Sequence, residues 1–114
     1  MDFQPDLTLD GTLPIHARAE EIEKILRENP VVILCGETGS GKSTQLPKLL
    51  LRAGFGTRRP IVVTQPRRVA ALSLARRVSE ELKADGTPFV GHKVRFDNRT
   101  TAQTRVVFAT DGTL

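Results

Sequence analysis

Residues 36–44 read GETGSGKST and hold the residue types best suited to chemistry in this chain. The three glycines let the backbone wrap around an anion with its N–H groups pointing inward. Lys42 places a positive charge beside phosphate groups, and the hydroxyl of Ser43 is an oxygen ligand of the kind that Mg²⁺ prefers. The spacing Gly-x-x-x-x-Gly-Lys-Ser is the Walker A pattern. The stretch therefore predicts a site for a nucleoside triphosphate with magnesium.

Within this loop, Lys42 is the candidate catalytic residue and Ser43 the candidate metal ligand. Thr44 suits helix packing as well as nucleotide contact, and the pattern does not define the roles of Glu37 and Thr38. The loop alone does not separate kinases, transporters, GTPases and motors, which all share it. The candidate nucleotide-binding residues of the loop are Gly36, Glu37, Thr38, Gly39, Ser40, Gly41, Lys42, Ser43 and Thr44.

A second stretch, TQPRRVAA at residues 64–71, carries two adjacent arginines just after a predicted strand. Pro66 fixes the turn, and Arg67 and Arg68 project where the strand ends. Ligand sites of open parallel sheets lie outside the carboxyl ends of the strands, so we expect this turn to share a sheet edge with the glycine loop. Paired arginines suit phosphodiester oxygens. A solvated Pro-Arg-Arg turn is the alternative, and composition does not separate the two.

The distribution of charge is uneven along the chain. The net charge is +4, and no acidic residue occurs between residues 38 and 79, where nine lysines and arginines lie. An acid-free middle third favours anionic partners, either phosphates or nucleic acid. The alternative is that these long side chains only solvate helix faces.

Hydrophobic periodicity predicts the elements that position these residues. Apolar residues from Ile15 onward fall at helical spacing, and Asn29-Pro30 ends that helix because a residue before proline avoids the helical region. The continuous apolar run at residues 31–35 predicts a strand buried on both faces. A helix is expected at residues 42–52, with Pro47 in its first turns, where proline is tolerated best.

The second half of the chain continues the alternation. We expect a short buried strand at residues 61–64, a helix at 68–82 with Val69, Leu72, Val78 and Leu82 inward, and strands at 90–96 and 105–109. Strands that alternate with helices predict an α/β fold with a parallel sheet flanked by helices.

Size and composition limit the classes of protein that fit. The 114 residues suit one domain or part of one. The single cysteine, Cys35, excludes an internal disulfide, so a reducing cytoplasm fits best, and its apolar neighbours favour a buried strand residue over a nucleophile. Cys35 and the distant His16 and His92 predict no metal cluster. The first residues have no basic and apolar pattern, so we expect neither a signal peptide nor a membrane span.

Four ordered stretches resemble one family. GETGSGKST, TQPRRVAA, VGHKVRF at residues 90–96 and TDG at residues 110–112 occur in the order and spacing of DEAH-box helicases. The opening LPIHARAEEI is similar to the lead-in of that family, and the bacterial HrpA-like RNA helicases are the nearest resemblance. It runs from Leu13 to Leu114, nearly the whole chain.

The resemblance implies a P-loop NTPase fold. Residues 13–114 would be the N-terminal part of the first RecA-like domain of a helicase, ending within motif Ib, and residues 1–12 a loosely ordered segment before it. It implies ATP and Mg²⁺ as cofactors. It also implies that Arg77, on the helix after the arginine turn, stacks on the base of the nucleotide, the alternative being a solvated helix arginine.

The resemblance also implies a nucleic-acid strand as partner. Arg67 and Arg68 lie in the motif Ia that grips the backbone, and Thr110, Asp111 and Gly112 match the motif Ib that faces the same strand. The role of Arg95 in VGHKVRF stays open between structure and the RNA path. RNA is preferred to DNA through the resemblance only.

Several parts of the family pattern are absent from these residues. The acidic DEAH motif, motif III and the second RecA-like domain would supply the carboxylates and arginine fingers that phosphoryl transfer needs. We therefore expect ATP hydrolysis and unwinding from the full-length parent and negligible activity from the 114-residue piece alone. The rival interpretation is a P-loop switch or binding module outside the helicases, whose arginine turn is ordinary surface.

Overall fold

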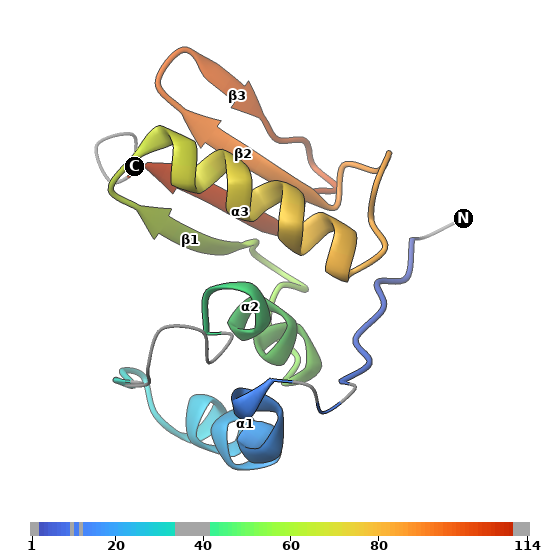
Figure 1. The fold of residues 1–114 in the computed structure, drawn as a ribbon, viewed down its shortest axis with the longest axis vertical. Helices are drawn as coiled ribbons and strands as arrows, with labels where there is room; N and C mark the ends of the chain where they lie inside the picture. Colours follow the sequence, from blue (N-terminus) through green and yellow to red (C-terminus); the bar gives the residue numbers. More distant parts are fainter. Residues whose placement is uncertain (1–2, 10, 12, 34–41, 111–114) are drawn as a thin grey trace.

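The computed structural model describes residues 3–9, 11, 13–33 and 42–110, and shows an α/β arrangement (Figure 1). A 3₁₀ helix η1 (Pro14–Arg18) leads into α1 (Ala19–Glu28), and α2 (Lys42–Arg52) packs beside α1. The second half contains β1 (Ile61–Gln65), α3 (Arg68–Glu81), β2 (Val90–Val94), β3 (Asp97–Arg99) and β4 (Val106–Thr110). No helix in the described part of the chain is both long and apolar enough to cross a membrane.

The four strands form one mostly parallel sheet in the order β1-β4-β2-β3. β4 lies between β1 and β2 and runs parallel to both, while β3 pairs antiparallel with β2. Helix α3 covers one face of this sheet, as Figure 1 shows. The predicted α/β class with helices flanking a sheet is therefore confirmed, and the sheet, predicted to be parallel, is mostly so.

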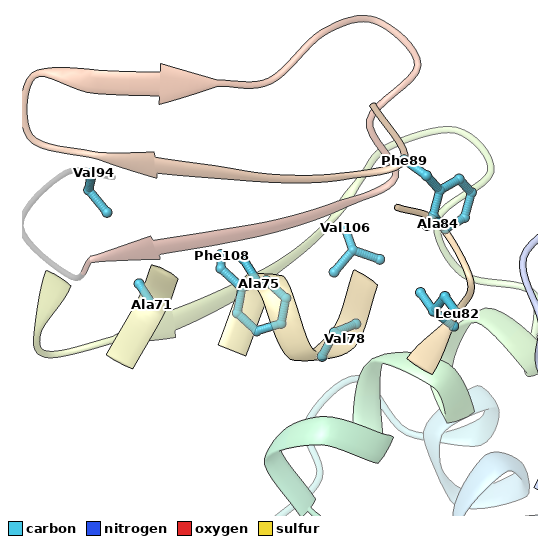
Figure 2. Packing of buried hydrophobic residues seen from close by; sticks show 9 residues of the cluster. All are labelled: Ala71, Ala75, Val78, Leu82, Ala84, Phe89, Val94, Val106 and Phe108. Carbon is cyan, nitrogen blue, oxygen red and sulfur yellow. The ribbon is translucent and has the colours of Figure 1, made fainter. Parts of the chain in front are cut away.

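The main hydrophobic core lies between α3 and the sheet (Figure 2). Phe108 on β4 is fully buried in the same cluster as Ala71 and Ala75 of α3. Small alanines on this face let the helix approach the strand closely enough to enclose the ring. Burial of a side chain of this size contributes about 2 kcal/mol. A second cluster joins η1, α1 and α2 around Ile15, Ile22 and Leu49.

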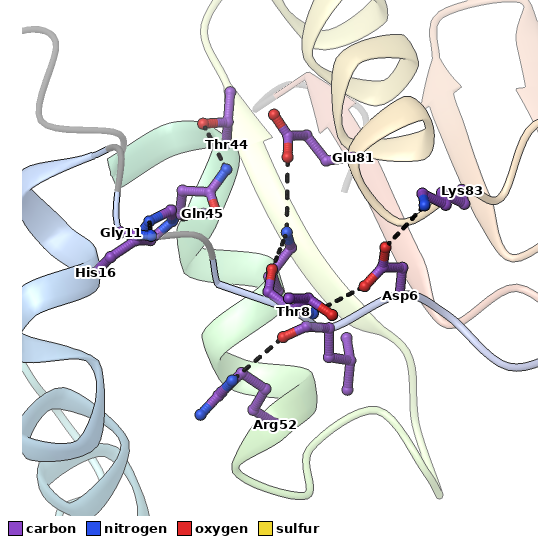
Figure 3. Close-up of polar contacts among 11 residues, drawn as sticks. Asp6, Thr8, Gly11, His16, Thr44, Gln45, Arg52, Glu81 and Lys83 are labelled. Atoms are coloured by element: carbon purple, nitrogen blue, oxygen red, sulfur yellow. Dashed lines mark hydrogen bonds and ion pairs between the residues drawn. The ribbon is translucent and has the colours of Figure 1, made fainter.

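Residues 3–9, which we call the N-terminal segment, lie across both parts of the molecule (Figure 3). The ring of Phe3 lies 5.0 Å from that of Phe89, and the amide of Asp6 donates to the Leu82 carbonyl at 2.9 Å. Phe3 and Leu7 pack against the main core, and Leu9 packs against the second cluster. The N-terminal segment thus connects the two clusters.

The predicted buried strand at residues 31–35 is wrong for the residues described. Val31, Val32 and Ile33 belong to no strand, and Val31 and Ile33 are 79% and 86% exposed. Residues 34–35, including Cys35, lie outside the described part. An apolar run becomes a buried strand only where neighbouring strands cover its edges, and the described sheet pairs its four strands without this segment.

Three details of the second half also differ from expectation. Val69 is 76% exposed, because two residues of helix rotate it about 200° away from the buried Ala71. β1 is half-buried on alternate residues only, with Val62 48% exposed, since α3 covers a single face. The expected strand at 90–96 ends at Val94, and the unpredicted β3 returns beside it, because a three-residue Asp-Asn-Arg strand has no apolar pattern to read.

Candidate functional site

Much of the predicted phosphate loop lies outside the described residues. Residues 36–41 of the loop are not among the described residues. Residues 111–112, at the end of the motif Ib resemblance, also lie outside them. Lys42 and Ser43 are described as the first residues of α2, without their side chains. Phosphate and magnesium binding therefore stay predictions. What the structure adds is that an 11-residue helix begins at Lys42, with its N-terminal N–H groups following the loop.

The first turns of α2 carry buried polar side chains that the sequence did not single out. Gln45 is 1% exposed, and its Oε1 lies 2.9 Å from Nε2 of His16 (Figure 3). Lys48 is 4% exposed; its ammonium donates to the Thr8 carbonyl at 3.0 Å and lies 3.6 Å from the Glu81 carboxylate. Buried polar groups need such partners. Gln45 and Lys48 make this side of α2 polar, and we call the surface that they form the polar wall.

A cavity of about 650 Å³ lies against this wall. Gln45 and Lys48 line it from α2, Arg77 and Glu81 from α3, and His16 from η1. The predicted base-stacking residue Arg77 is thus in the same cavity as the residues that follow the phosphate loop. The volume falls within the range of small-molecule sites. The sequence could not predict that Arg77 shares a cavity with Gln45 and Lys48, because α2 and α3 are brought together only by packing.

The carboxyl ends of β1 and β4 place two predicted nucleic-acid motifs side by side. Gln65 pairs with Thr110 in the parallel register, so the arginine turn leaves the sheet next to the end of β4. Arg67 occupies the N-cap position of α3, but its side chain makes no capping hydrogen bond. Arg68 is the first residue of the helix. Both arginines are exposed. The expectation that the arginine turn shares this edge with the glycine loop stays a prediction, because residues 36–41 lie outside the described part of the chain.

The turn after β2 brings two more residues to that edge. Lys93 pairs with Ala109, so Arg95 and Phe96 follow the carboxyl end of a third parallel strand. The Phe96 ring is 92% exposed, and the Arg95 guanidinium carbon lies 5.0 Å from its centroid. Sequence reasoning left Arg95 open and missed Phe96. The alternation of Val90, His92, Val94 and Phe96 favoured a continuous strand here, and the polar Asp-Asn pair after Phe96 lies on β3.

A compact ion cluster supports this turn from the two strands. Nε2 of His92 lies 3.0 Å from one oxygen of Asp97, and Nε of Arg99 donates to the other at 3.1 Å. The hydrogen bond from His92, with a smaller contribution from Arg99, lowers the pKa of Asp97 below its usual value. This carboxylate is therefore ionised and paired. The neighbouring exposed cations Lys93 and Arg95 keep the surface of the turn basic.

Comparison with known proteins identifies the likeness. No family model matches the chain. It is 45% identical over 97% of its length to an ATP-dependent RNA helicase HrpA homolog of Haemophilus influenzae, of which it covers 8%. It is 48% identical over 95% of its length to the probable ATP-dependent RNA helicase DHR2 of Saccharomyces cerevisiae and over 90% to DHX40 of Homo sapiens, covering 15% and 13% of them. This chain matches one segment of the DEAH-box RNA helicases.

The helicase match is long in this chain and short in its relatives. Because it covers 97% of the 114 residues, it necessarily includes the glycine loop, the arginine turn and the VGHKVRF stretch. The resemblance on which the sequence argument rests is therefore confirmed. The chain spans only 8% to 15% of the length of the helicases named above.

Proposed function

We propose that this chain is the ATP-binding portion of an ATP-dependent RNA helicase, the N-terminal part of its first RecA-like domain. The observation that carries the proposal is the shared sheet edge. Arg67 and Arg68 follow β1, Thr110 ends β4, and Arg95 follows β2, on three neighbouring parallel strands. Relatives named as ATP-dependent RNA helicases, 43% to 48% identical to this chain, support the same reading.

Nucleotide binding is assigned to residues 36–44 together with Arg77. Lys42 would neutralise charge on the β- and γ-phosphates, and Ser43 would ligate the magnesium ion, which stabilises charge on the transferred phosphoryl group. Arg77 lines the 650 Å³ cavity beside Gln45 of α2, the helix that follows the loop. Stacking of its guanidinium on the base would use a surface that needs no base-specific hydrogen bonds.

Nucleic-acid binding is assigned to the sheet edge, with Asp111 and Gly112 as further candidates from motif Ib. Arginines suit phosphate oxygens because their planar fork donates two parallel hydrogen bonds. The exposed Phe96 ring offers a base-stacking surface with Arg95 above it. Cations combined with an aromatic platform are typical of proteins that bind single strands with little sequence preference.

Hydrolysis is assigned to the longer protein. Phosphoryl transfer needs further positioned charges around metal and leaving group, and the missing DEAH motif and second RecA-like domain are the parts that would provide them. We expect the 114-residue chain to bind ATP without turnover. Nucleic-acid-stimulated turnover by this chain, abolished in Lys42→Ala, would contradict that expectation.

A salt titration of RNA binding tests the proposed edge. The protein would be the longer helicase carrying Arg67→Ala with Arg68→Ala, and the measurement the dissociation constant of a labelled single-stranded RNA at several salt concentrations. Removal of one phosphate-binding cation on a single strand reduces the slope of log K against log salt by about 0.7. We expect weaker binding and, for the two arginines together, a slope reduced by about 1.4.

The chain offers a matched control for this pair. Arg58 and Arg59 are also adjacent and exposed, but they precede β1 and therefore lie at the amino end of this strand, opposite to the carboxyl end that Arg67 and Arg68 follow. The five residues of β1 separate the two pairs by about 16 Å. Arg58→Ala with Arg59→Ala should leave the slope nearly unchanged. Equal effects of the two double variants, or none, would favour the P-loop switch over the helicase.

A further inference from the structure

A hollow of about 610 Å³ opens at the amino ends of β2 and β4, away from the site described above. We call it the amino-end hollow. Phe3, Pro88 and Phe89 form its apolar floor, and Arg105 lines it as well. The rings of Phe3 and Phe89 lie 5.0 Å apart, and Figure 2 shows Phe89 at one end of the main core. The amino-end hollow therefore combines an apolar surface with a cation.

Arg105 holds two turns together beside this hollow. Its Nη1 donates to the carbonyls of Gly56 and Thr57, both at 3.2 Å, and its Nη2 donates to the carbonyl of Ala102 at 2.8 Å. Carbonyl oxygens accept hydrogen bonds but carry no net charge, so the guanidinium remains fully positive. Because the same bonds fix the turn before β1 against the turn before β4, the charged rim of the hollow is held in place before any partner arrives.

Two exposed arginines, Arg58 and Arg59, follow the turn that Arg105 holds. Within the described part of the chain, no carboxylate forms an ion pair with Arg58, Arg59 or Arg105. Asp85 adds one carboxylate beside the hollow, since the residue after it lines the hollow, but the arginines outnumber it. Several other cations do pair with carboxylates, namely Arg18, Lys48, Arg52, Lys83 and Arg99.

The shape of the aromatic floor favours a protein side chain over a nucleobase. Stacking of a base needs an open ring face, such as that of Phe96, which is 92% exposed. Phe89 is only 9% exposed, and its ring is tilted by 58° against that of Phe3. An uneven apolar floor fits an aliphatic or aromatic side chain, and arginines bind carboxylates through paired hydrogen bonds. These features together suit an acidic peptide.

We propose that the amino-end hollow binds an acidic peptide segment of another protein, with one apolar side chain against Phe3 and Phe89 and carboxylates on the neighbouring arginines. The apolar side chain supplies an anchor, and the charges fix the orientation of the peptide. The five residues of β4 separate this hollow from the proposed nucleic-acid edge by about 16 Å. A peptide and an RNA strand can therefore be bound together. The inference goes beyond the proposed function and does not rest on it.

The test measures binding of a synthetic peptide to the longer helicase by fluorescence anisotropy. The labelled probe has one phenylalanine between aspartates, and excess unlabelled single-stranded RNA is present so that the peptide does not occupy the basic nucleic-acid edge. We expect saturable binding. A probe with alanine in place of the phenylalanine should bind about tenfold more weakly, because it loses the buried ring. A probe with lysines in place of the aspartates should not bind.

Two protein variants locate the binding site. Arg58→Ala with Arg59→Ala removes two exposed ion pairs with the peptide and should weaken binding about fivefold. Gln103 lines the hollow, and its Oε1 accepts a hydrogen bond from the Thr101 hydroxyl. Gln103→Glu keeps that acceptor but places a carboxylate at the rim, so it should also weaken binding of the acidic probe.

A third variant controls for total charge. Lys24→Ala with Arg27→Ala removes two exposed cations from α1, far from the hollow in sequence, and should leave the affinity of the acidic probe unchanged. Thermal unfolding verifies that each variant is folded.

Every outcome decides for or against the proposal. Absence of saturable binding to the folded wild type overturns it, whether the hollow has no affinity or another part of the longer protein covers it. Equal affinity of the wild type and Gln103→Glu, or equal losses in the Arg58–Arg59 and Lys24–Arg27 variants, also overturns it. Binding seen only without RNA assigns the peptide to the nucleic-acid edge instead. Failure to bind ATP or RNA concerns the proposed function alone.

Discussion

At the scale of single residues, Phe96 combines unusual backbone geometry with unusual exposure. Its φ of +67° lies in the left-handed region, which costs a bulky residue about 1–2 kcal/mol. Its ring is 92% exposed and gains little from burial. A large aromatic residue kept where glycine would be less strained is consistent with a contact made outside the chain, such as the base stacking proposed above.

The variant Phe96→Gly separates stability from binding. Relief of the left-handed backbone is offset by the greater entropy of glycine in the unfolded chain and by removal of the interaction with Arg95, so we expect the free energy of unfolding to change by less than about 1 kcal/mol. Loss of one stacked base should weaken single-stranded RNA binding about tenfold. Denaturant unfolding and RNA titration measure the two effects, and unchanged RNA affinity would remove Phe96 from the interface.

Asp6 should make stability depend on acid pH. The amide of Thr8 donates to its carboxylate at 2.9 Å, and this bond, with the Thr8 hydroxyl and Lys83, lowers its pKa to about 2 from 3.8. A lowered pKa in the folded state means that the stabilisation is complete above pH 3.8 and is lost as the pH falls through about 2.

The measurement is the thermal midpoint between about pH 5 and pH 2, a range that begins above the unfolded pKa of this carboxyl group and reaches the folded one. Wild type should lose more stability over this range than Asp6→Asn, which has no proton to take up. Asp85→Asn, at an exposed carboxylate in a turn, should behave as the wild type does. Parallel curves for wild type and Asp6→Asn would show that Asp6 is not paired in solution.

At the scale of elements, an ion pair holds α1 against α2. Nε of Arg52 lies 2.6 Å from the carboxylate of Glu23, and the Glu23 side chain is 10% exposed. Nη1 of Arg52 donates to the Leu7 carbonyl. Helix α1 buries only a narrow stripe of residues. Its orientation should therefore depend on this pair more than on hydrophobic area.

Removal of the cation tests this dependence. Arg52→Ala leaves a nearly buried carboxylate without its partner and should cost about 2 kcal/mol of unfolding free energy. This is less than a fully buried pair would cost, because Arg52 is 32% exposed and water screens it. Arg18→Ala removes an exposed pair with Glu21 and should have a much smaller effect. Equal costs in chemical denaturation would contradict the prediction.

At the scale of the whole molecule, the N-terminal segment contacts both the helical part and the sheet part. It supplies carbonyl partners for Lys48 and Arg52, and Phe3 and Leu7 contact the main core. The sequence predicted a loosely ordered segment here, because short mixed stretches at a terminus rarely pack. Its order in solution stays a prediction.

Deletion of residues 1–9 measures the contribution of the segment. It removes several hydrogen-bond partners and the three partly buried apolar side chains of Phe3, Leu7 and Leu9, which together should cost roughly 3 kcal/mol. The expected result is a lower denaturation midpoint. Replacement of residues 1–9 by a glycine-serine linker of equal length is the control for chain length. An unchanged midpoint would show that the segment is loosely held after all.

Local pattern predicted much of the fold because periodicity records which side of an element is buried. It located α1, α2, α3, β1 and β4 within a few residues, and it selected the arginine turn from its types and spacing. The Walker A pattern and the resemblance to RNA helicases were likewise available from the chain alone. In each case the information lies within a few neighbouring residues.

The tertiary structure decided what depends on neighbours distant in sequence. Strand order and register place Arg95 and Phe96 beside the arginine turn, and packing of α2 against α3 brings Arg77 to Gln45. The exposure of Val31 and Ile33 follows from the same cause, since an apolar run does not by itself indicate whether neighbouring strands will cover it. The residue types that suit nucleotide and RNA are thus written in the sequence, whereas their grouping into a cavity and an edge is decided by contacts between elements.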